Sequence, residues 1–136
     1  MRDFIRIESS VLQRVESHAR QEPARECCGL LAGREGVIAG AYPARNAAGN
    51  PATEYEIAPA ELFAMMREIR AAGLQLLGIY HSHPNGVLEP SPVDVAQAYY
   101  PDAAYFIISS AAGDEAVLRA FSIRDGRVSQ LQIAVV

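Results

Sequence analysis

Apolar residues recur at intervals of three and four in two parts of the chain, the spacing that places side chains on one face of a helix. The first part predicts a helix from about Ser10 to Arg20, with Ser9 or Ser10 as its N-terminal cap. The buried face of this helix is expected to comprise Val11, Leu12, Val15 and Ala19.

The second part predicts a helix from Pro59 to Ala72, because proline suits the first helical position and Gly73 suits the position just past the end. Its buried face is expected to comprise Leu62, Phe63, Met66 and Ile69. A third helix, reaching to about Tyr99, is indicated where Ser91 can cap and Pro92 can take the first position.

Short apolar runs between turn residues predict strands in the rest of the chain. Residues 33–36 and Asp125-Gly126 read as hairpin turns, and Pro84 to Pro90 reads as a loop. The order of elements predicts an α/β fold with a mixed, curved sheet flanked by helices, parallel pairing around the second helix and antiparallel hairpins at the ends. The predicted strands are Cys28–Ala32, Val37–Tyr42, a short Glu54–Ile57, Leu76–His83, Ala104–Ser109, Ala116–Ser122 and Val128–Val135.

Composition narrows the class of protein without naming a function. With 136 residues, half of them hydrophobic, the chain fits one globular domain spanning residues 1–136. Its net charge of −4 and its scattered arginines argue against a nucleic-acid partner. No stretch is apolar for long enough to span a membrane, and no signal region follows the N-terminus, so residence in the cytoplasm is expected.

The chemistry of the chain is concentrated at the end of one predicted strand. Two of the three histidines are His81 and His83, which flank Ser82. Side chains two apart on a strand point to the same face, so both imidazoles can offer a nitrogen to one metal ion. Asp94 follows in the first turn of the third helix, and the intervening loop is short enough to return it to the histidines. Two histidines and one carboxylate leave a fourth zinc position open, which is the catalytic pattern.

Hydrolysis at such a site also needs a proton carrier and a donor to the developing oxyanion. Glu26, at the start of the strand from Cys28, is the candidate acid-base group, because adjacent strands can bring it opposite His81. Ser91 is the candidate oxyanion donor. Ser91 and Asp94 also have the spacing of a helix capping box, and a capping Asp94 would be poorly placed to face a metal.

Together these residues resemble the JAMM signature of the MPN-domain (Mov34/MPN/PAD-1) zinc metalloproteases. That signature is an upstream glutamate, then His-x-His, seven residues, serine, two residues and aspartate. Here it matches Glu26, His81-Ser82-His83, the seven residues Pro84 to Pro90, Ser91 and Asp94. Glu26 competes with other glutamates and is singled out by its spacing to Gly29 in this signature. The resemblance covers nearly the whole chain and is to the bacterial-type, single-domain members.

The resemblance implies that one zinc ion per chain binds His81, His83 and Asp94, with Glu26 as acid-base group and Ser91 at the oxyanion. It implies a cytidine-deaminase-like α/β/α fold. It further implies cleavage of a peptide or isopeptide bond next to the C-terminal Gly-Gly of a ubiquitin-like sulfur-carrier protein. An extended tail of that partner could lie along a sheet edge.

Other interpretations of the same residues stay open at this point. The chain could be a non-catalytic MPN-type binding module or another zinc hydrolase. The adjacent Cys27 and Cys28 point to opposite faces of a strand and are expected to pack, although a thiol peptidase is an alternative. His18 reads as a surface residue, and Tyr99-Tyr100 as core or interface. Asn46 and Asn50 lie in an irregular segment, where they either form turns or contact substrate.

Overall fold

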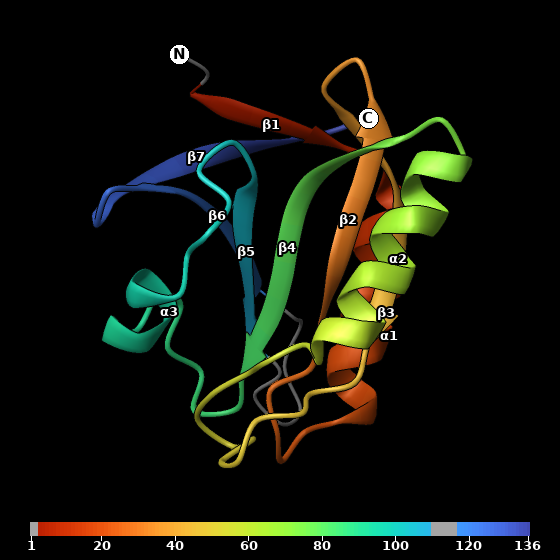
Figure 1. Cartoon of the computed structure of the whole chain (residues 1–136). Helices are drawn as coiled ribbons and strands as arrows, with labels where there is room; N and C mark the ends of the chain where they lie inside the picture. Colours follow the sequence, from red (N-terminus) through yellow and green to blue (C-terminus); the bar gives the residue numbers. More distant parts are fainter. Residues whose placement is uncertain (1–2, 110–116) are drawn as a thin grey trace.

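Seven strands and three helices follow one another in the computed structural model, which describes residues 3–109 and 117–136 (Figure 1). Of the predicted strands that lie wholly within the described residues, five are within two residues of their expected limits at both ends, and the three predicted helices are present. The elements are β1 (Phe4–Ile7), α1 (Ser9–Gln21), β2 (Cys28–Arg34), β3 (Val37–Ala44), α2 (Pro59–Ala71), β4 (Gln75–His83), α3 (Pro92–Ala96), β5 (Ala104–Ser109), β6 (Val117–Arg124) and β7 (Arg127–Val135).

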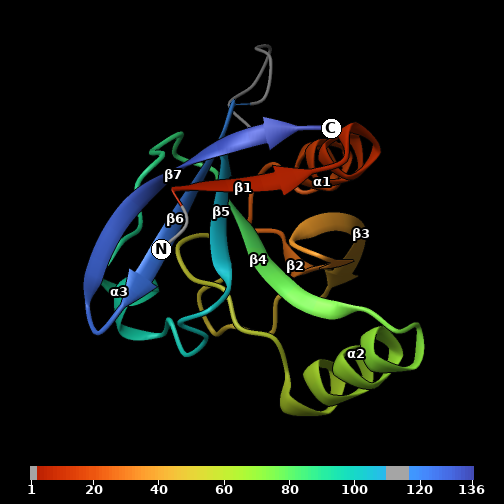
Figure 2. The ribbon, with the colours of Figure 1, turned by 90° about the horizontal axis from the view of Figure 1, so that it is seen from above.

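The strands form one sheet in the order β1-β3-β2-β4-β5-β6-β7, and it closes on itself because β1 pairs in parallel with both β3 and β7. Seen from above, the strands curve around the molecule (Figure 2). The predicted mixed, curved sheet with flanking helices is confirmed. Its closure was not predicted, since the short β1 has a weak local pattern and owes its place to partners at the far end of the chain.

The predicted parallel pairing around the second helix is wrong. The strands before and after α2 are β3 and β4, and β2 lies between them, antiparallel to both. The parallel crossover instead contains α3 and joins β4 to β5, whose register pairs His81 with Ile107 and His83 with Ser109. The two hairpins, β2–β3 and β6–β7, are antiparallel as expected.

Alternating side chains divide the buried residues into two cores, one on each face of the sheet. The first core packs against α1, through Val11, Val15 and Ala19. The second core packs against α2, through Met65 and Ile69. Along β4 the alternation sends Tyr80 into the first core and Ile79 into the second. His81 and His83 have the parity of Ile79, so they lie on the α2 face of the sheet.

Several local predictions need correction. The cap residue of α1 is Glu8, and it makes no side-chain cap hydrogen bond, so neither Ser9 nor Ser10 caps this helix. On α2, Phe63 is 65% exposed, and Met65 is buried in its place. The third helix ends at Ala96 rather than near Tyr99.

The remaining corrections concern turns and the irregular segment. Strand β2 extends to Arg34, so the first hairpin turn narrows to Glu35-Gly36, both with positive φ. The expected strand at 54–57 is not a strand. The first residue of the strand predicted to begin at Ala116 lies outside the described residues. Among the residues described, no helix has the length and apolar character needed to cross a bilayer.

Candidate metal centre

Four buried ionisable side chains converge at the end of β4: Glu26, His81, His83 and Asp94. One potential ligand atom from each lies within 4.8 Å of the others. The chain therefore brings together, from three separate segments, the four titratable residues that the sequence singled out for this site.

Strand β4 places the two histidines side by side. Both are nearly inaccessible, with exposed fractions of 1% and 5%, and their Nε2 atoms are 3.0 Å apart. Between them, Ser82 points to the other face, where its Oγ accepts a hydrogen bond of 2.8 Å from the backbone N–H of Cys27. Ladders with β2 and β5 on either side fix the strand in the middle of the sheet.

Asp94 caps helix α3 and faces the histidines at the same time. Its Oδ2 accepts a hydrogen bond of 2.8 Å from the backbone N–H of Ser91, and the Oγ of Ser91 accepts one of 3.1 Å from the N–H of Asp94. The same Oδ2 lies 3.1 Å from Nε2 of both His81 and His83. The expectation that capping would turn Asp94 away from a metal is therefore wrong, because one oxygen can accept in several directions.

The donor set suits a metal cation. Nδ1 of His83 lies 2.7 Å from the carbonyl oxygen of Val87, which can only accept, so Nδ1 carries a hydrogen and Nε2 of the neutral ring presents a lone pair. This lone pair faces the Asp94 carboxylate and Nε2 of His81, and a proton or a cation must separate such atoms. Three ligands of one tetrahedral zinc ion lie roughly 3.3 Å from one another, close to the 3.0–3.1 Å found here.

The pKa shifts of His81 and Asp94 favour the ligand state, whereas that of His83 favours a protonated ring in the absence of a cation. Burial lowers the pKa of His81, so its ring stays neutral, as a metal ligand must be. Burial alone would also lower the pKa of His83, but hydrogen bonds to Asp94 and Val87 outweigh it and raise the pKa. Burial alone would raise the pKa of Asp94, yet the hydrogen bonds with His81 and His83 hold it well below its usual range.

Glu26 lies just before β2 and is 3% exposed. Its Oε2 is 4.0 Å from Nε2 of His83, and its Oε1 has no hydrogen-bond partner among the described residues. Burial raises the pKa of Glu26 to about 7, which is the range for a group that both takes and gives a proton at neutral pH. A bound cation beside it would shift the pKa downward.

The two cysteines are packing residues. Cys27 lies in the first core and Cys28 in the second, and both are fully buried, as their positions on opposite faces predict. Burial raises the pKa of Cys27 to about 11 and that of Cys28 to about 12. A thiolate nucleophile at neutral pH is thereby disfavoured.

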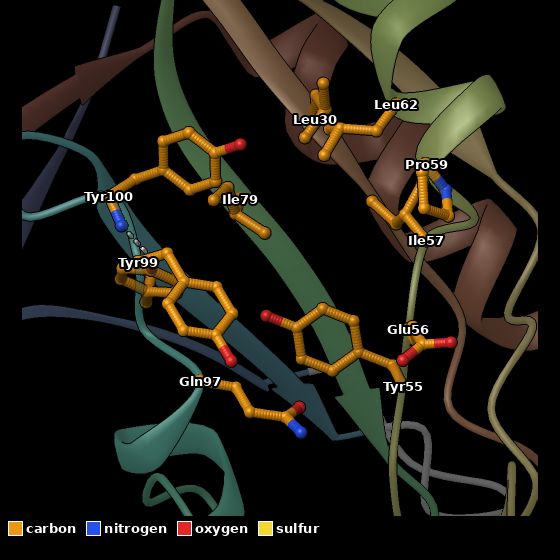
Figure 3. Close-up of a pocket in the computed structure, with 11 residues that line it drawn as sticks. Leu30, Tyr55, Glu56, Ile57, Pro59, Leu62, Ile79, Gln97, Tyr99 and Tyr100 are labelled. Carbon is orange, nitrogen blue, oxygen red and sulfur yellow. Dashed lines mark hydrogen bonds between the residues drawn. The ribbon is translucent and has the colours of Figure 1, made fainter.

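Beside the metal centre lies a residue that the sequence did not single out. The ring of Tyr55 stacks on that of His81, with centroids 4.4 Å apart and planes inclined by 22°. Tyr55 also lines a cavity of about 290 Å³ between α2 and the segment after α3 (Figure 3). The sequence could not predict this contact, because Tyr55 lies outside helices and strands and is brought to His81 by the tertiary structure.

Tyrosines and aliphatic side chains dominate this cavity, in which Tyr55 and Tyr99 project toward each other from opposite sides (Figure 3). The sequence predicted that Tyr99 and Tyr100 lie in the core or at an interface. Tyr99 is 73% exposed and therefore lies outside the core, whereas Tyr100 packs against the second core. Tyr100 is half-buried, and its backbone N–H donates to the hydroxyl of Tyr105 at 3.0 Å. A largely apolar cavity, open to the surface, therefore lies next to the metal centre.

The structure also shows the surroundings of His18, Asn50 and Asn46. His18 is not a simple surface residue: its Nδ1 lies 2.7 Å from the hydroxyl of buried Tyr80, and its Nε2 lies 2.7 Å from a carboxylate oxygen of Glu22. Asn50 is exposed in a turn, where its carbonyl accepts from the N–H of residues 53 and 54. Asn46 is 4% exposed, and its side-chain amide is hydrogen-bonded to backbone groups, so it is not available to contact substrate.

Comparison with known proteins adds a family and a fold. Residues 8–124 match the family described as prokaryotic homologs of the JAB domain. The chain is 35% identical over 102 residues to a desampylase of Haloferax volcanii, covering 74% of this chain and 73% of that one. It is 33% identical over 132 residues to the CysO-cysteine peptidase of Mycobacterium tuberculosis, covering 96% and 90%.

Solved structures agree on the architecture. A protein of Desulfitobacterium hafniense matches with a TM-score of 0.87 and 31% identity, over 98% of this chain and 93% of that one. A JAB1/MPN domain protein of Archaeoglobus fulgidus matches with a TM-score of 0.62 over 96% and 99% of the two chains. At 18% identity the second match bears on the fold alone.

Proposed function

This chain belongs to the family of prokaryotic homologs of the JAB domain, and we propose that it is a zinc-dependent peptidase acting on a ubiquitin-like sulfur-carrier protein. The bond it hydrolyses is the peptide or isopeptide bond next to the C-terminal Gly-Gly of that carrier. Support comes from two relatives whose names describe a desampylase and a CysO-cysteine peptidase. The predicted single domain over residues 1–136 and the cytoplasmic location are parts of this proposal that rest on the sequence.

One observation supports the metal above all others: three potential ligand atoms, Nε2 of His81, Nε2 of His83 and Oδ2 of Asp94, converge at 3.0–3.1 Å in a buried place. We assign these three residues as the ligands of one zinc ion per chain. Three protein ligands leave the fourth position free, which distinguishes a catalytic zinc site from a structural one. Bound there, zinc would supply Lewis acidity that polarises the scissile carbonyl and makes a water molecule more acidic.

The residues of the chain itself transfer protons, stabilise the oxyanion and orient a metal ligand. Glu26 takes the proton from the attacking water and later gives it to the leaving amine, a double role that a pKa near neutrality permits. The Oγ of Ser91 accepts from the N–H of Asp94 and keeps its own hydrogen, which it can donate to the oxyanion. The Val87 carbonyl holds the His83 ring in the tautomer that frees Nε2.

The cavity beside Tyr55 offers a place for the substrate next to the scissile bond. Its lining includes Tyr55, Ile79 and Leu62, and no arginine among the residues that the structure describes, so it suits an apolar part of the carrier rather than an acidic one. A buried place for part of the substrate would also exclude water from the reacting atoms.

Metal analysis and cleavage test the proposal together. Purified chain is expected to contain one zinc ion and to release the extension from a carrier protein that continues past its Gly-Gly. Absence of zinc after reconstitution would refute the metal assignment. Zinc without cleavage of this carrier would leave the metal site in place and refute the substrate.

A further inference from the structure

The candidate acid-base residue lies outside the hydrogen-bonded ladders of the sheet. The pairing of β2 with both neighbours begins at Cys28, two residues after Glu26. Hydrogen bonds from the irregular segment 45–58 take the place of a ladder. The N–H of Glu26 donates to the carbonyl of Pro51 at 2.7 Å, and its carbonyl accepts from Nδ2 of Asn46 at 2.9 Å. The position of Glu26 therefore depends on this segment.

Asn46 uses both ends of its buried side-chain amide. Nδ2 donates to the carbonyl of Glu54 at 2.8 Å in addition to that of Glu26. Oδ1 accepts from the N–H of Ala48 at 2.9 Å and from the N–H of Glu56 at 3.2 Å. Two donor hydrogens and two lone pairs are all that an asparagine side chain offers, so each is engaged.

The two bonds to Glu54 and Glu56 bracket Tyr55, whose ring stacks on His81. The backbone N–H of Ala47 strengthens the same connection by donating to the carbonyl of Glu56 at 2.7 Å. One side chain therefore connects the backbone of the acid-base residue with the backbone of the residue that packs on the first histidine. Nδ1 of His81 has no hydrogen-bond partner among the described residues, so the ring is held by the contacts of its Nε2 with His83 and Asp94 at one end and by the stacked ring of Tyr55 on its face.

We infer that Asn46 is a positioning residue of the metal centre, which holds Glu26 and Tyr55 in a fixed relation to His81. The inference rests on the proposed function for its effect on turnover, but not for its effect on the His81 ring. Asn46 acts on catalysis through Glu26 and on the ligand through Tyr55. Loss of a residue that orients a catalytic group lowers activity roughly 10- to 100-fold.

The test compares Asn46→Asp with the native chain. Aspartate has nearly the same shape and keeps the acceptor for Ala48 and Glu56, but its carboxylate cannot donate to the carbonyls of Glu26 and Glu54. Asn46→Ser is the second variant, for use if the first does not fold. Ile123→Val, a small truncation in the second core, controls for a general loss of stability.

Two measurements are made on folded, zinc-loaded and chelated samples. With a carrier protein extended past its Gly-Gly as substrate, Asn46→Asp should retain its zinc and its KM but lose roughly 10- to 100-fold in kcat. In the chelated chain, proton resonances of the His81 ring should move away from their native positions, toward those of Tyr55→Leu, because the ring current of Tyr55 is displaced. Ile123→Val should change neither.

Native kcat and native His81 resonances in a folded Asn46 variant would overturn the inference. So would an equal loss of kcat in Asn46→Asp and Ile123→Val, since that pattern belongs to a structural role. A native chain that neither binds zinc nor cleaves the carrier would contradict the proposed function instead. In that case the His81 resonances still decide whether Asn46 holds Tyr55 in place.

Discussion

Replacing Glu26 with glutamine is expected to abolish hydrolysis and, in the metal-free chain, to make stability less dependent on pH. Glu26 is 3% exposed, and burial raises its pKa from 4.5 to about 7. The unfolded chain therefore releases this proton near pH 4.5, whereas the folded chain keeps it until about pH 7. Between these values the folded state binds more protons, so Glu26 makes the fold less stable as the pH rises. Glutamine cannot titrate, and this contribution disappears.

The shift in pKa gives the size of the effect. A change from 4.5 to about 7 corresponds to roughly 3 kcal/mol of unfolding free energy, at about 1.4 kcal/mol for each pKa unit. Glutamine also has an amide to satisfy in a place where Oε1 of Glu26 has no partner among the described residues, which costs about 1–3 kcal/mol. That cost is the same at every pH. The difference in stability between variant and native should therefore shift in favour of the variant by about 2–3 kcal/mol from pH 5 to pH 8.

Urea unfolding of chelated protein, followed by circular dichroism across this pH range, measures the difference. Glu68→Gln, on the exposed face of α2, controls for the loss of one negative charge. Native and Glu26→Gln curves that stay parallel within about 0.5 kcal/mol from pH 5 to pH 8 would refute the argument from burial. With zinc present the pH effect should shrink, because a neighbouring cation favours the carboxylate.

Four further predictions concern the metal, the thiols, the serine and the cavity. Asp94→Ala should lose most of its zinc, as judged by metal analysis, and full retention would remove Asp94 from the ligand set. A chelator should inactivate the enzyme reversibly while a thiol-blocking reagent leaves its rate unchanged, since the buried cysteines have raised pKa values; the opposite pattern in rate assays would favour a cysteine mechanism. Ser91→Ala should lower kcat roughly 100-fold and, by loss of the cap, lower the unfolding free energy by about 1 kcal/mol; a native kcat in steady-state assays would exclude a role at the oxyanion. Tyr99→Ala, which opens the exposed side of the cavity, should raise KM for the carrier with little change in kcat, and an unchanged KM would separate the cavity from substrate binding.

The sequence was most informative where chemistry and local pattern coincide. His81 and His83 share one strand, and Ser91 and Asp94 share one helical turn, so their spacing alone shows that each pair can act together. The second histidine's orientation could not be predicted, because it depends on the carbonyl of Val87 in a loop without regular structure.

Long-range features escaped prediction for a physical reason. Strand β1 is only four residues long and is held by partners on β3 and β7, which no local pattern reveals. Phe63 follows the helical stripe as well as Met65 does, and only the position of α2 against the sheet decides which of them is buried. Tyr55 and Asn46 lie in an irregular segment, and their roles arise from contacts with His81 and Glu26.

The central claim is that this buried cluster is a zinc peptidase site with Glu26 as its acid-base group. Its most direct test is intact-mass analysis of a ubiquitin-like carrier extended past its Gly-Gly, after incubation with zinc-loaded native chain or with Glu26→Gln. The account predicts that the native chain cuts directly after Gly-Gly, whereas the variant, holding the same amount of zinc, leaves the carrier intact. Equal cleavage by both proteins would contradict the role of Glu26, and an intact carrier with both would contradict the proposed substrate.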